Sequence, residues 1–564
     1  MSGLRRSASA RPHGIARATL LELGGCLLAL TAALLMVTHL VDTPRSWLLF
    51  YDSDSVLPAL IHGSLAAGQP QDWAMSSVLF IPELAVYLGL AALGLSVKAT
   101  FILNAIVNLI AVYLSFRFVA GCVMPCRPRW SRIAGALLAT AAVTAFVLLD
   151  STANRNSLEL VSLLATTTYY SATVVAMILT VGIVGRILSP RQPRRISWVP
   201  VVVLFLIAAL SAMTDPLYLV WSAVPVAIVV AAACLLRVAS LVNGALVIGS
   251  VGVGIVGGLL LRIPLAPWIT VSGASYAQPD LFARSFQYYA TLLRMRLETV
   301  PGALSIVLVL AIIAVNVAIF VRMLKHRNTA GVLVAGFGWM TPVIVTVGAI
   351  LLGTNAARYL EPDFFAPLAG LCVVPAILGH KHPRALAAGR VSSGRWLVHR
   401  EIADREPADR EIAGREPASR KMLSPLLVLA SVVVLAASVL TAMVVAIPRL
   451  SAAANSIDPD VRCVDQWVTA SGEIGVGEYW TIRAPKAYLA DPARLVQVNG
   501  DLDAYAWLVN RADFGATRAS FAVVSAADPP LEIPAARRAT VTQVTHCGRY
   551  TIVDYGHSAL PIGP

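Results

Sequence analysis

Long apolar runs separated by short polar segments make up most of this chain. A helix needs about 20 apolar residues to cross about 30 Å of hydrocarbon with its backbone hydrogen bonds satisfied internally. The runs predict a polytopic α-helical membrane protein with about 11 transmembrane helices. These helices are expected at residues 18–40, 100–122, 133–149, 170–188, 198–214, 217–237, 241–261, 302–322, 330–352, 362–379 and 425–447.

One further apolar segment, residues 79–95, is not assigned by hydrophobicity alone. Counting it as a crossing would put the basic loops around Arg127 and Arg194 on the outer side, which the positive-inside rule opposes. If 79–95 instead lies in the outer interface or is re-entrant, every basic loop becomes cytoplasmic. We therefore expect a cytoplasmic basic tail at 1–17, followed by a first helix that acts as an uncleaved signal anchor.

This topology divides the chain into membrane and soluble parts. The expected parts are a transmembrane domain at 18–379 with long outer loops 41–99 and 262–301, a cytoplasmic linker at 380–424, a last transmembrane helix at 425–447 and an outer soluble domain at 448–564. Long loops in a compact membrane protein tend to be functional. We expect a multi-pass protein of the bacterial cytoplasmic membrane with a periplasmic or extracellular C-terminal domain.

Composition agrees with this class. Of the 564 residues, 57% are hydrophobic and 13% are charged, and the mean hydropathy is +0.73, which excludes a large soluble core. The formal net charge is +13, but the basic residues lie in short loops between apolar runs, as topology signals do. The basic balance therefore predicts no nucleic-acid partner.

The linker contains a five-residue unit repeated four times at 400–419. A period of five matches neither a helix nor a strand, and solenoid repeats are several times longer. We interpret the segment as a charged, low-complexity connection, with a regulatory docking role as the alternative.

The C-terminal region has the pattern of a small α/β domain. A helix is expected at 461–470 and strands at 494–498, 520–524, 539–545 and 550–554. Two cysteines, Cys463 and Cys547, would lie in an oxidising compartment, so we expect a disulfide worth about 4 kcal/mol in the chain-entropy model. Two buried free thiols remain the alternative.

Ionisable residues avoid the centres of the predicted spans. A transporter normally keeps paired charges near the membrane midplane, where its ligand binds. This chain instead concentrates them in outer loops and outer helix ends, which favours an outer-face site over a transporter or a flippase. The residues concerned are Asp52, Asp54, Glu83, Asp150, Arg155, Glu159, Asp215, Arg262, Arg284, Arg294, Arg296, Arg358, Glu361 and Asp363.

Two short motifs stand out among them. Tyr51-Asp52-Ser53-Asp54 opens the first long outer loop, and Arg358-Tyr359-Leu-Glu-Pro362 begins a late outer helix. With the order of tail, span, acidic loop, interfacial helix, further spans and outer domain, the chain resembles the GT-C superfamily of membrane glycosyltransferases. These enzymes use polyprenyl-phosphate sugars as donors. Several of their branches have adjacent acidic residues, whereas this chain has a spaced pair, which leaves open which aspartate is the base.

The resemblance implies a role for each motif. Asp52 and Asp54 would be catalytic, as a base or as ligands of Mg²⁺ or Mn²⁺, and Arg358 with Tyr359 would bind the donor. The acceptor would be a hydroxyl of a lipid-linked glycan or polysaccharide, reached at the membrane lipid surface. Such a transfer needs no strong acid because phosphate leaves readily. A carboxylate that takes the acceptor proton contributes about 10²- to 10⁴-fold, and a guanidinium suits the departing phosphate.

Structural alternatives remain for these residues. Asp54 or Ser55 would also serve as a cap of a helix beginning near Val56, where Pro58 fits an early turn. Arg358 would also serve as an interfacial anchor. A non-catalytic scaffold that displays the outer domain is the third reading of the whole chain.

Three further substrate-binding candidates have similar alternatives. Asp215 lies between two predicted spans and suits a turn as well as a sugar contact. Glu83 follows a proline at the start of the interfacial segment, where helix-start electrostatics also explain it. Arg155 lies at an outer edge, as do Tyr169 and Tyr170, which fit an aromatic belt.

Overall fold

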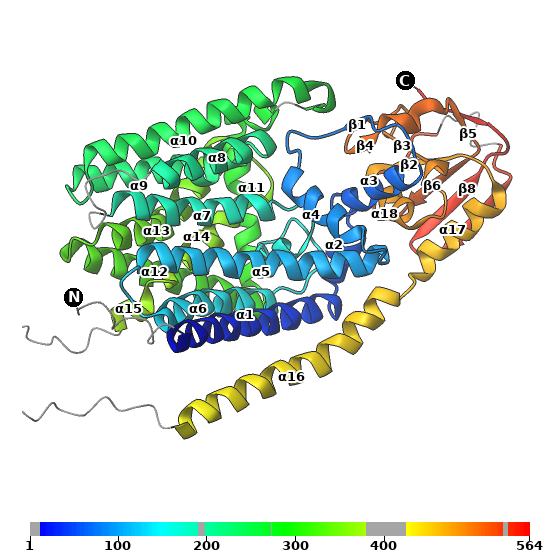
Figure 1. The fold of residues 1–564 in the computed structure, drawn as a ribbon. Helices are drawn as coiled ribbons and strands as arrows, with labels where there is room; N and C mark the ends of the chain where they lie inside the picture. Colours follow the sequence, from blue (N-terminus) through cyan, green and yellow to red (C-terminus); the bar gives the residue numbers. More distant parts are fainter. Residues whose placement is uncertain (1–11, 190–197, 272, 379–424, 534–539, 564) are drawn as a thin grey trace, which may run out of the picture.

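A bundle of helices carries a small mixed domain at one end (Figure 1). The computed structural model describes residues 12–189, 198–271, 273–378, 425–533 and 540–563. The first 11 residues and the linker with its pentapeptide repeat lie outside the described residues. The described residues are mostly helical, at 69%. We call the end of the bundle that faces the C-terminal domain the domain end.

Eight helices within the described residues are long and apolar enough to cross a membrane. The protein is therefore polytopic. Seven of them coincide with or lie within α1 (Pro12–Val41), α5 (Val97–Val123), α6 (Arg129–Leu148), α7 (Ser171–Leu188), α10 (Leu241–Leu261), α12 (Val300–Lys325) and α13 (Thr329–Leu351), and the eighth, Ala436–Ser471, overlaps α16 (Pro425–Asn455).

The other three predicted spans form shorter helices. Residues 198–214 form α8 (Trp198–Thr214), and 217–237 contain a π-turn, η2 (Leu219–Ala223), that continues into α9 (Val224–Leu235). The predicted span at 362–379 is divided into α14 (Glu361–Leu371) and α15 (Val374–Leu378), and Pro367 lies inside α14. The total of eleven crossings thus stays a prediction.

The segment at 79–95 forms a short helix, α4 (Ile81–Ala91). Its 11 residues extend over about 16 Å, roughly half of the hydrocarbon thickness, so this helix by itself does not cross. Together with α2 (Ser46–Phe50), α3 (Leu57–Ala66) and β1 (Trp73–Ala74), it fills the space between the bundle and the C-terminal domain (Figure 1).

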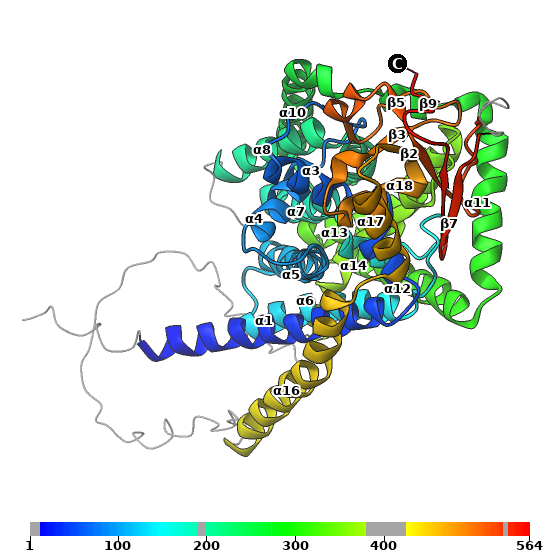
Figure 2. The same ribbon diagram turned by 90° about the vertical axis from the view of Figure 1, so that its right-hand side faces the viewer.

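The second long loop contains an amphipathic helix, α11 (Phe282–Leu297), which runs across the domain end (Figure 2). Ser285, Tyr289, Leu292 and Arg296 are buried on one face. Phe282 and Phe286 are exposed on another. A helix with this distribution suits the membrane interface.

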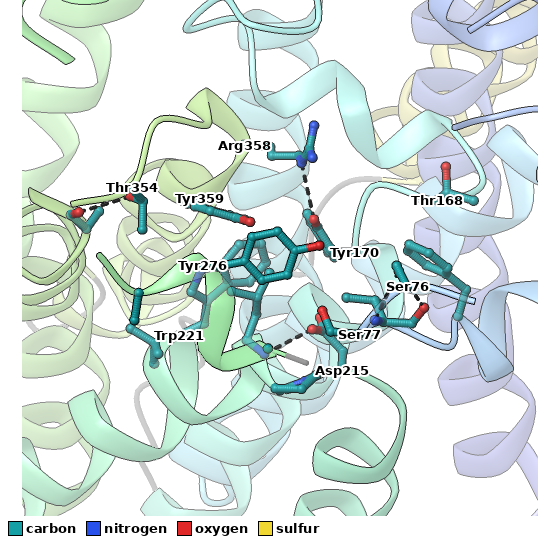
Figure 3. Close-up of a pocket in the computed structure, with 18 of the residues that line it drawn as sticks. Ser76, Ser77, Thr168, Tyr170, Asp215, Trp221, Tyr276, Thr354, Arg358 and Tyr359 are labelled. Carbon is teal, nitrogen blue, oxygen red and sulfur yellow. Dashed lines mark hydrogen bonds between the residues drawn. The ribbon is translucent and has the colours of Figure 1, made fainter. Parts of the chain in front are cut away.

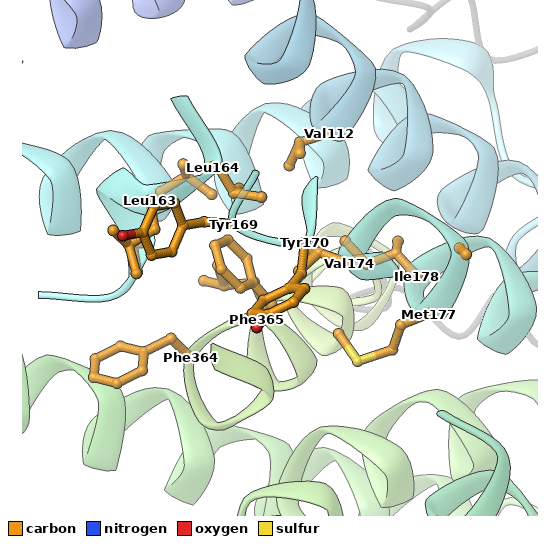
Figure 4. Close-up of a cluster of buried hydrophobic side chains, with 14 of the residues drawn as sticks. Val112, Leu163, Leu164, Tyr169, Tyr170, Val174, Met177, Ile178, Phe364 and Phe365 are labelled. Atoms are coloured by element: carbon orange, nitrogen blue, oxygen red, sulfur yellow. The ribbon is translucent and has the colours of Figure 1, made fainter. Parts of the chain in front are cut away.

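The bundle packs closely around aromatic and small residues. Helices α8 and α10 approach each other at Gly254 and Gly258, where an added Cβ would meet backbone atoms of α8. Behind the domain end, Tyr169, Tyr170 and Phe365 pack into a buried cluster with side chains of α5, α7 and α14 (Figure 4).

The C-terminal domain confirms the predicted α/β pattern. Its five-stranded sheet has the order β3-β2-β6-β8-β7, with β2 parallel to β3 and β6, and with β8 antiparallel to β6 and β7. Two helices, α17 (Pro459–Ser471) and α18 (Tyr479–Tyr488), accompany the sheet. The strands are β2 (Gly475–Glu478), β3 (Leu495–Val498), β6 (Phe521–Ser525), β7 (Gln543–Cys547) and β8 (Tyr550–Asp554), and two-stranded pairs form from β5 (Arg518–Ala519) with β9 (Leu560–Pro561) and from β1 with β4 (Val509–Asn510).

The predicted disulfide is present. Cys463 of α17 is bonded to Cys547 of β7, and their Cα atoms are 5.4 Å apart. The alternative of two free thiols is therefore wrong.

The domain is joined directly to the first long loop. Strand β1 pairs antiparallel with β4, so that Trp73 lies opposite Asn510. Arg511 forms an ion pair with Asp72 at 2.8 Å. The transmembrane part and the C-terminal domain, divided at residue 448 in the sequence, are therefore joined by a strand pair, and both surround one space.

Candidate active site

A cavity of about 190 Å³ opens at the domain end of the bundle. Both long loops contribute to it, through Asp54 and residues 76–80 from the first and through Tyr276 from the second. The C-terminal domain adds Trp507 and Leu508. The two predicted loops and the domain thus meet around one space.

The lining divides into a polar and an apolar part. Figure 3 shows Arg358 beside Tyr170, with Ser76 and Thr168 across the cavity from Thr354. The polar and aromatic side chains are Asp54, Ser76, Ser77, Phe80, Thr168, Tyr170, Asp215, Trp221, Tyr276, Thr354, Arg358, Tyr359 and Trp507. Apolar residues come from α13 and from the segment that leads into α9, namely Val345, Ala349, Leu352, Leu217 and Val220.

Asp52 is buried and does not line this cavity. Its Oδ2 accepts hydrogen bonds from the Tyr169 hydroxyl at 2.9 Å and from the backbone N–H groups of Asp54 and Ser55 at 3.2 and 3.3 Å. Its Oδ1 accepts from Arg155 at 3.3 Å. Burial and the charge of Asp54 raise the pKa of the Asp52 carboxyl, while Arg155 and Tyr169 oppose the rise. Asp52 therefore organises the turn of the acidic loop.

Asp54 occupies a different environment. It is partly exposed and lines the cavity, and its Oδ1 accepts a hydrogen bond from the Tyr479 hydroxyl at 2.5 Å. The proposed cap role for Asp54 or Ser55 is wrong, because the residue before α3 is Val56 and no side chain caps that helix. Of the two aspartates, Asp54 is the one placed to meet a ligand.

The two arginines predicted for substrate binding also differ. Arg358 lines the cavity, and its Nε donates to the Tyr170 hydroxyl at 3.2 Å. Arg155 is absent from the lining and instead holds Asp52, with its Cζ 3.4 Å from the centre of the Trp480 ring. Arg358 is thus the cation that lines this cavity and is available to a ligand there. Arg155 instead stabilises the acidic loop through its ion pair with Asp52.

Asp215 lies at the floor of the cavity. Its Oδ2 accepts from the Thr173 hydroxyl at 2.5 Å, and its Oδ1 accepts from the Leu217 N–H at 2.9 Å. Burial raises the pKa of Asp215 to about 6, against these two hydrogen bonds and the charge of Arg262. The turn role expected for Asp215 is therefore present, and the residue also lines the space predicted for the sugar.

Glu83 is separate from the cavity lining. Its Oε1 accepts from the Ala172 N–H at 3.1 Å, in the first turn of α7. Burial raises the pKa of Glu83 to about 7. The structure thus brings Glu83 to the start of another helix and does not bring it to the cavity.

The two aspartates do not fit a divalent cation. The Asp52 carboxylate already accepts four hydrogen bonds. Within the described ranges, no group of three or more His, Cys, Asp or Glu side chains is arranged to hold a metal ion. The expectation of Mg²⁺ or Mn²⁺ at this pair thus gains no support from the geometry.

Several site residues were missed or misread from the sequence. Tyr169 and Tyr170 were assigned to an aromatic belt, but they are only 1% and 6% exposed and hold Asp52 and Arg358. Tyr479 and Trp507 come from the C-terminal domain, for which the sequence indicated no site residue. The available signal for the first pair was their position at the outer edge of a predicted span, 170–188, rather than near its centre.

Comparisons with known protein families, curated proteins and solved structures give no match to this chain. The geometry of the site therefore carries the functional argument.

Proposed function

We propose that this protein is a membrane glycosyltransferase of the GT-C type, which transfers a sugar from a polyprenyl-phosphate donor to an acceptor hydroxyl on the outer face of a bacterial cytoplasmic membrane. The observation that supports this most is a single cavity that places the Asp54 carboxylate and the Arg358 guanidinium between aromatic walls and an apolar flank. The domain end would face outward, with about eleven crossings behind it.

Asp54 would act as the general base. The acceptor oxygen attacks the anomeric carbon, the bond from that carbon to the phosphate oxygen breaks, and the acceptor proton moves to Asp54. Attack from the side opposite the phosphate inverts the anomeric configuration. A base in hydrogen-bond reach contributes about 10²- to 10⁴-fold. Asp54 is preferred over Asp52 because it lines the cavity, whereas Asp52 has its oxygens occupied inside the loop.

Arg358 would bind the donor phosphate. Negative charge grows on the phosphate as its bond to the sugar breaks, and a guanidinium offers paired donors at a fixed positive charge. Tyr170 holds this side chain through Nε. Charge-assisted hydrogen bonds of this kind are roughly twice as strong as neutral ones.

The remaining lining matches the two other parts of the donor. Tyr276, Trp221 and Trp507 present aromatic surface to the sugar, and hydroxyls of Ser76 and Thr354 lie nearby. The apolar residues of α13 and of the segment before α9 provide a path for the isoprenoid chain towards lipid. Sites for small ligands combine an apolar lining with a few placed polar groups in this way.

The test uses purified protein in lipid nanodiscs and short synthetic donors. Binding of farnesyl phosphate is followed by tryptophan fluorescence, and release of sugar from farnesyl-phosphate mannose, glucose and arabinose is measured with water or added glycans as acceptor. Asp54→Asn is expected to keep binding and to lose sugar release at least about 100-fold. Arg358→Gln is expected to weaken binding.

The matched control for Arg358 is Arg294→Gln, since the Arg294 side chain is 82% exposed and forms an ion pair with Glu298, four residues further along the chain. A transporter or a lipid-linked glycan flippase would bind the donor, and a non-catalytic scaffold would display the C-terminal domain, but none of them would cleave the donor.

Full sugar release by Asp54→Asn would overturn the proposed base.

A further inference from the structure

Helix α18 of the C-terminal domain is docked directly on the acidic loop. The Tyr479 hydroxyl donates to Asp54 Oδ1 at 2.5 Å. The Ser53 hydroxyl contacts the carbonyl oxygens of Tyr479 and Trp480, each at 3.2 Å. The Arg483 Nε donates to the Ser53 carbonyl at 2.8 Å. About one turn of a helix more than 400 positions away in sequence thus contacts two consecutive residues of the loop, Ser53 and Asp54.

Arg483 is a costly residue in this position. It is 1% exposed, and burial lowers the pKa of its guanidinium. Within the described part of the chain, its hydrogen-bond partners are the carbonyl oxygens of Ser53 and Leu508. Leu508 lines the cavity. A buried charge destabilises a fold unless it is paired and hydrogen-bonded, and Nη2 of Arg483 has no hydrogen-bond partner among the described residues. Its Nε and Nη1 atoms tie the acidic loop to the cavity wall.

Tyr479 determines how the Asp54 carboxylate is oriented. Its hydroxyl occupies one carboxylate oxygen, Oδ1. Its ring is 1% exposed and packs against Trp480, with the ring centres 4.6 Å apart, and the Arg483 Cζ lies 4.9 Å from the ring centre. A donor held this rigidly restricts the rotamer of its acceptor, and catalytic groups lose much of their effect when they are misplaced by about 1 Å. Among the described residues, none donates a hydrogen bond to the other oxygen, Oδ2, which is the atom that would take the acceptor proton.

We propose that Tyr479 and Arg483 are positioning residues for the base Asp54, so that the C-terminal domain is part of the active site and not a separate appendage. This inference rests on the proposed function, because it assumes that Asp54 takes a proton. Tyr479 acts through one hydrogen bond to the carboxylate, and Arg483 acts through the backbone of Ser53.

The test compares two tyrosines of the same helix. Tyr479→Phe removes the hydroxyl that contacts Asp54, whereas Tyr488→Phe removes one that donates to the Phe50 carbonyl at 2.7 Å and leaves Asp54 untouched. Both variants lose one docking hydrogen bond of α18. Sugar release from farnesyl-phosphate donors is measured at equal amounts of folded protein, judged by gel filtration.

Tyr479→Phe is expected to lower kcat about 10- to 100-fold with KM within about twofold, because orientation of the base is lost and donor binding is kept. Tyr488→Phe is expected to change both constants less than about threefold. Arg483→Gln should follow Tyr479→Phe in kcat.

Three outcomes separate the two proposals. Inactive Asp54→Asn together with unchanged kcat in Tyr479→Phe would overturn the positioning role and leave the proposed function intact. Equal losses in Tyr479→Phe and Tyr488→Phe would also overturn it, since docking alone would then explain them. Active Asp54→Asn would instead contradict the proposed function.

Discussion

At the residue scale, position in the fold separates groups that are chemically alike. Asp52 and Asp54 are two residues apart, but one is buried in a network with Tyr169 and Arg155 and the other lines the cavity. Desolvation disfavours the charged form of a carboxyl group, and a local donor favours it. The same side chain therefore supports loop structure at position 52, whereas at position 54 it faces the cavity, where we propose it as the proton acceptor.

Glu83 gives a prediction on pH and stability. Burial raises its pKa from the ordinary 4.5 to about 7, so the folded state holds its proton more tightly than the unfolded state. Below about pH 4.5 this favours neither state, and stability falls as pH rises from there to about 7, by up to about 3 kcal/mol. Glu83→Gln, which keeps an oxygen for the Ala172 N–H, should therefore melt at a higher temperature than the unaltered protein at pH 8 and at a similar temperature at pH 5. A variant without this pH-dependent difference in thermal unfolding would contradict the buried, uncharged state of Glu83.

At the element scale, close contacts between helices depend on single side chains. Helices α8 and α10 touch where Gly254 and Gly258 leave room for the backbone of α8, a small-xxx-small spacing that suits helix pairs in lipid. Near the domain end, a buried cluster of two arginines and two carboxylates joins the start of α2 and the segment after α6 to α11. Its members, Arg45, Asp150, Glu159 and Arg296, each have side chains at most 5% exposed.

The glycine contact predicts a difference between two substitutions in α10. A Cβ at Gly258 would meet the Ala209 carbonyl, whereas one at Gly252 would meet nothing within 4 Å. Gly258→Ala should cost about 1–3 kcal/mol through overpacking, and Gly252→Ala should be neutral or stabilising by up to about 1 kcal/mol. Thermal unfolding in detergent measures both, and equal melting temperatures would show that the helices are not in this contact.

The ion cluster predicts a second pairwise difference, this time on α11. Arg296 bonds Glu159 at 2.6 Å and Asp150 at 2.9 Å, and burial already raises the pKa of Asp150 to about 6. Arg296→Met leaves the carboxylates undercompensated and should cost about 3–5 kcal/mol. The neighbouring exposed Arg294→Met should cost less than about 1 kcal/mol. The yield of folded protein and its melting temperature compare the two, and tolerance of Arg296→Met would argue against a charged cluster.

At the scale of the whole molecule, a membrane bundle and a soluble domain enclose one cavity. The domain is attached through the β1–β4 pair, the α18 contacts and α17, where Arg549 pairs with Asp458 at 2.8 Å and its Cζ lies 5.4 Å from the Tyr51 ring centre. These attachments contact the acidic loop and its neighbouring residues. We therefore expect unfolding of the C-terminal domain to disturb the structure of the site.

The disulfide supplies the whole-molecule prediction. Cys463 and Cys547 are 84 residues apart, and closing a loop of this length stabilises by about 4 kcal/mol in the chain-entropy model. Cys547→Ser should lower the melting temperature of the protein and speed proteolysis within the C-terminal domain. Cys126→Ser, which removes an exposed free thiol, is the control. Identical proteolysis of the two variants would show that the bond contributes little.

The sequence by itself determined the membrane class, the long helices, the α/β domain and the disulfide, because apolar run length, strand alternation and cysteine context are local signals. It also identified Asp54, Arg358, Tyr359 and Asp215, which the structure gathers in one cavity. Only the tertiary structure decided that Asp52 is buried while Asp54 is accessible, and that Glu83 serves another helix. The Tyr479 contact with Asp54 joins residues 425 positions apart. Such pairings depend on how separate elements pack, and no periodicity along the chain records them.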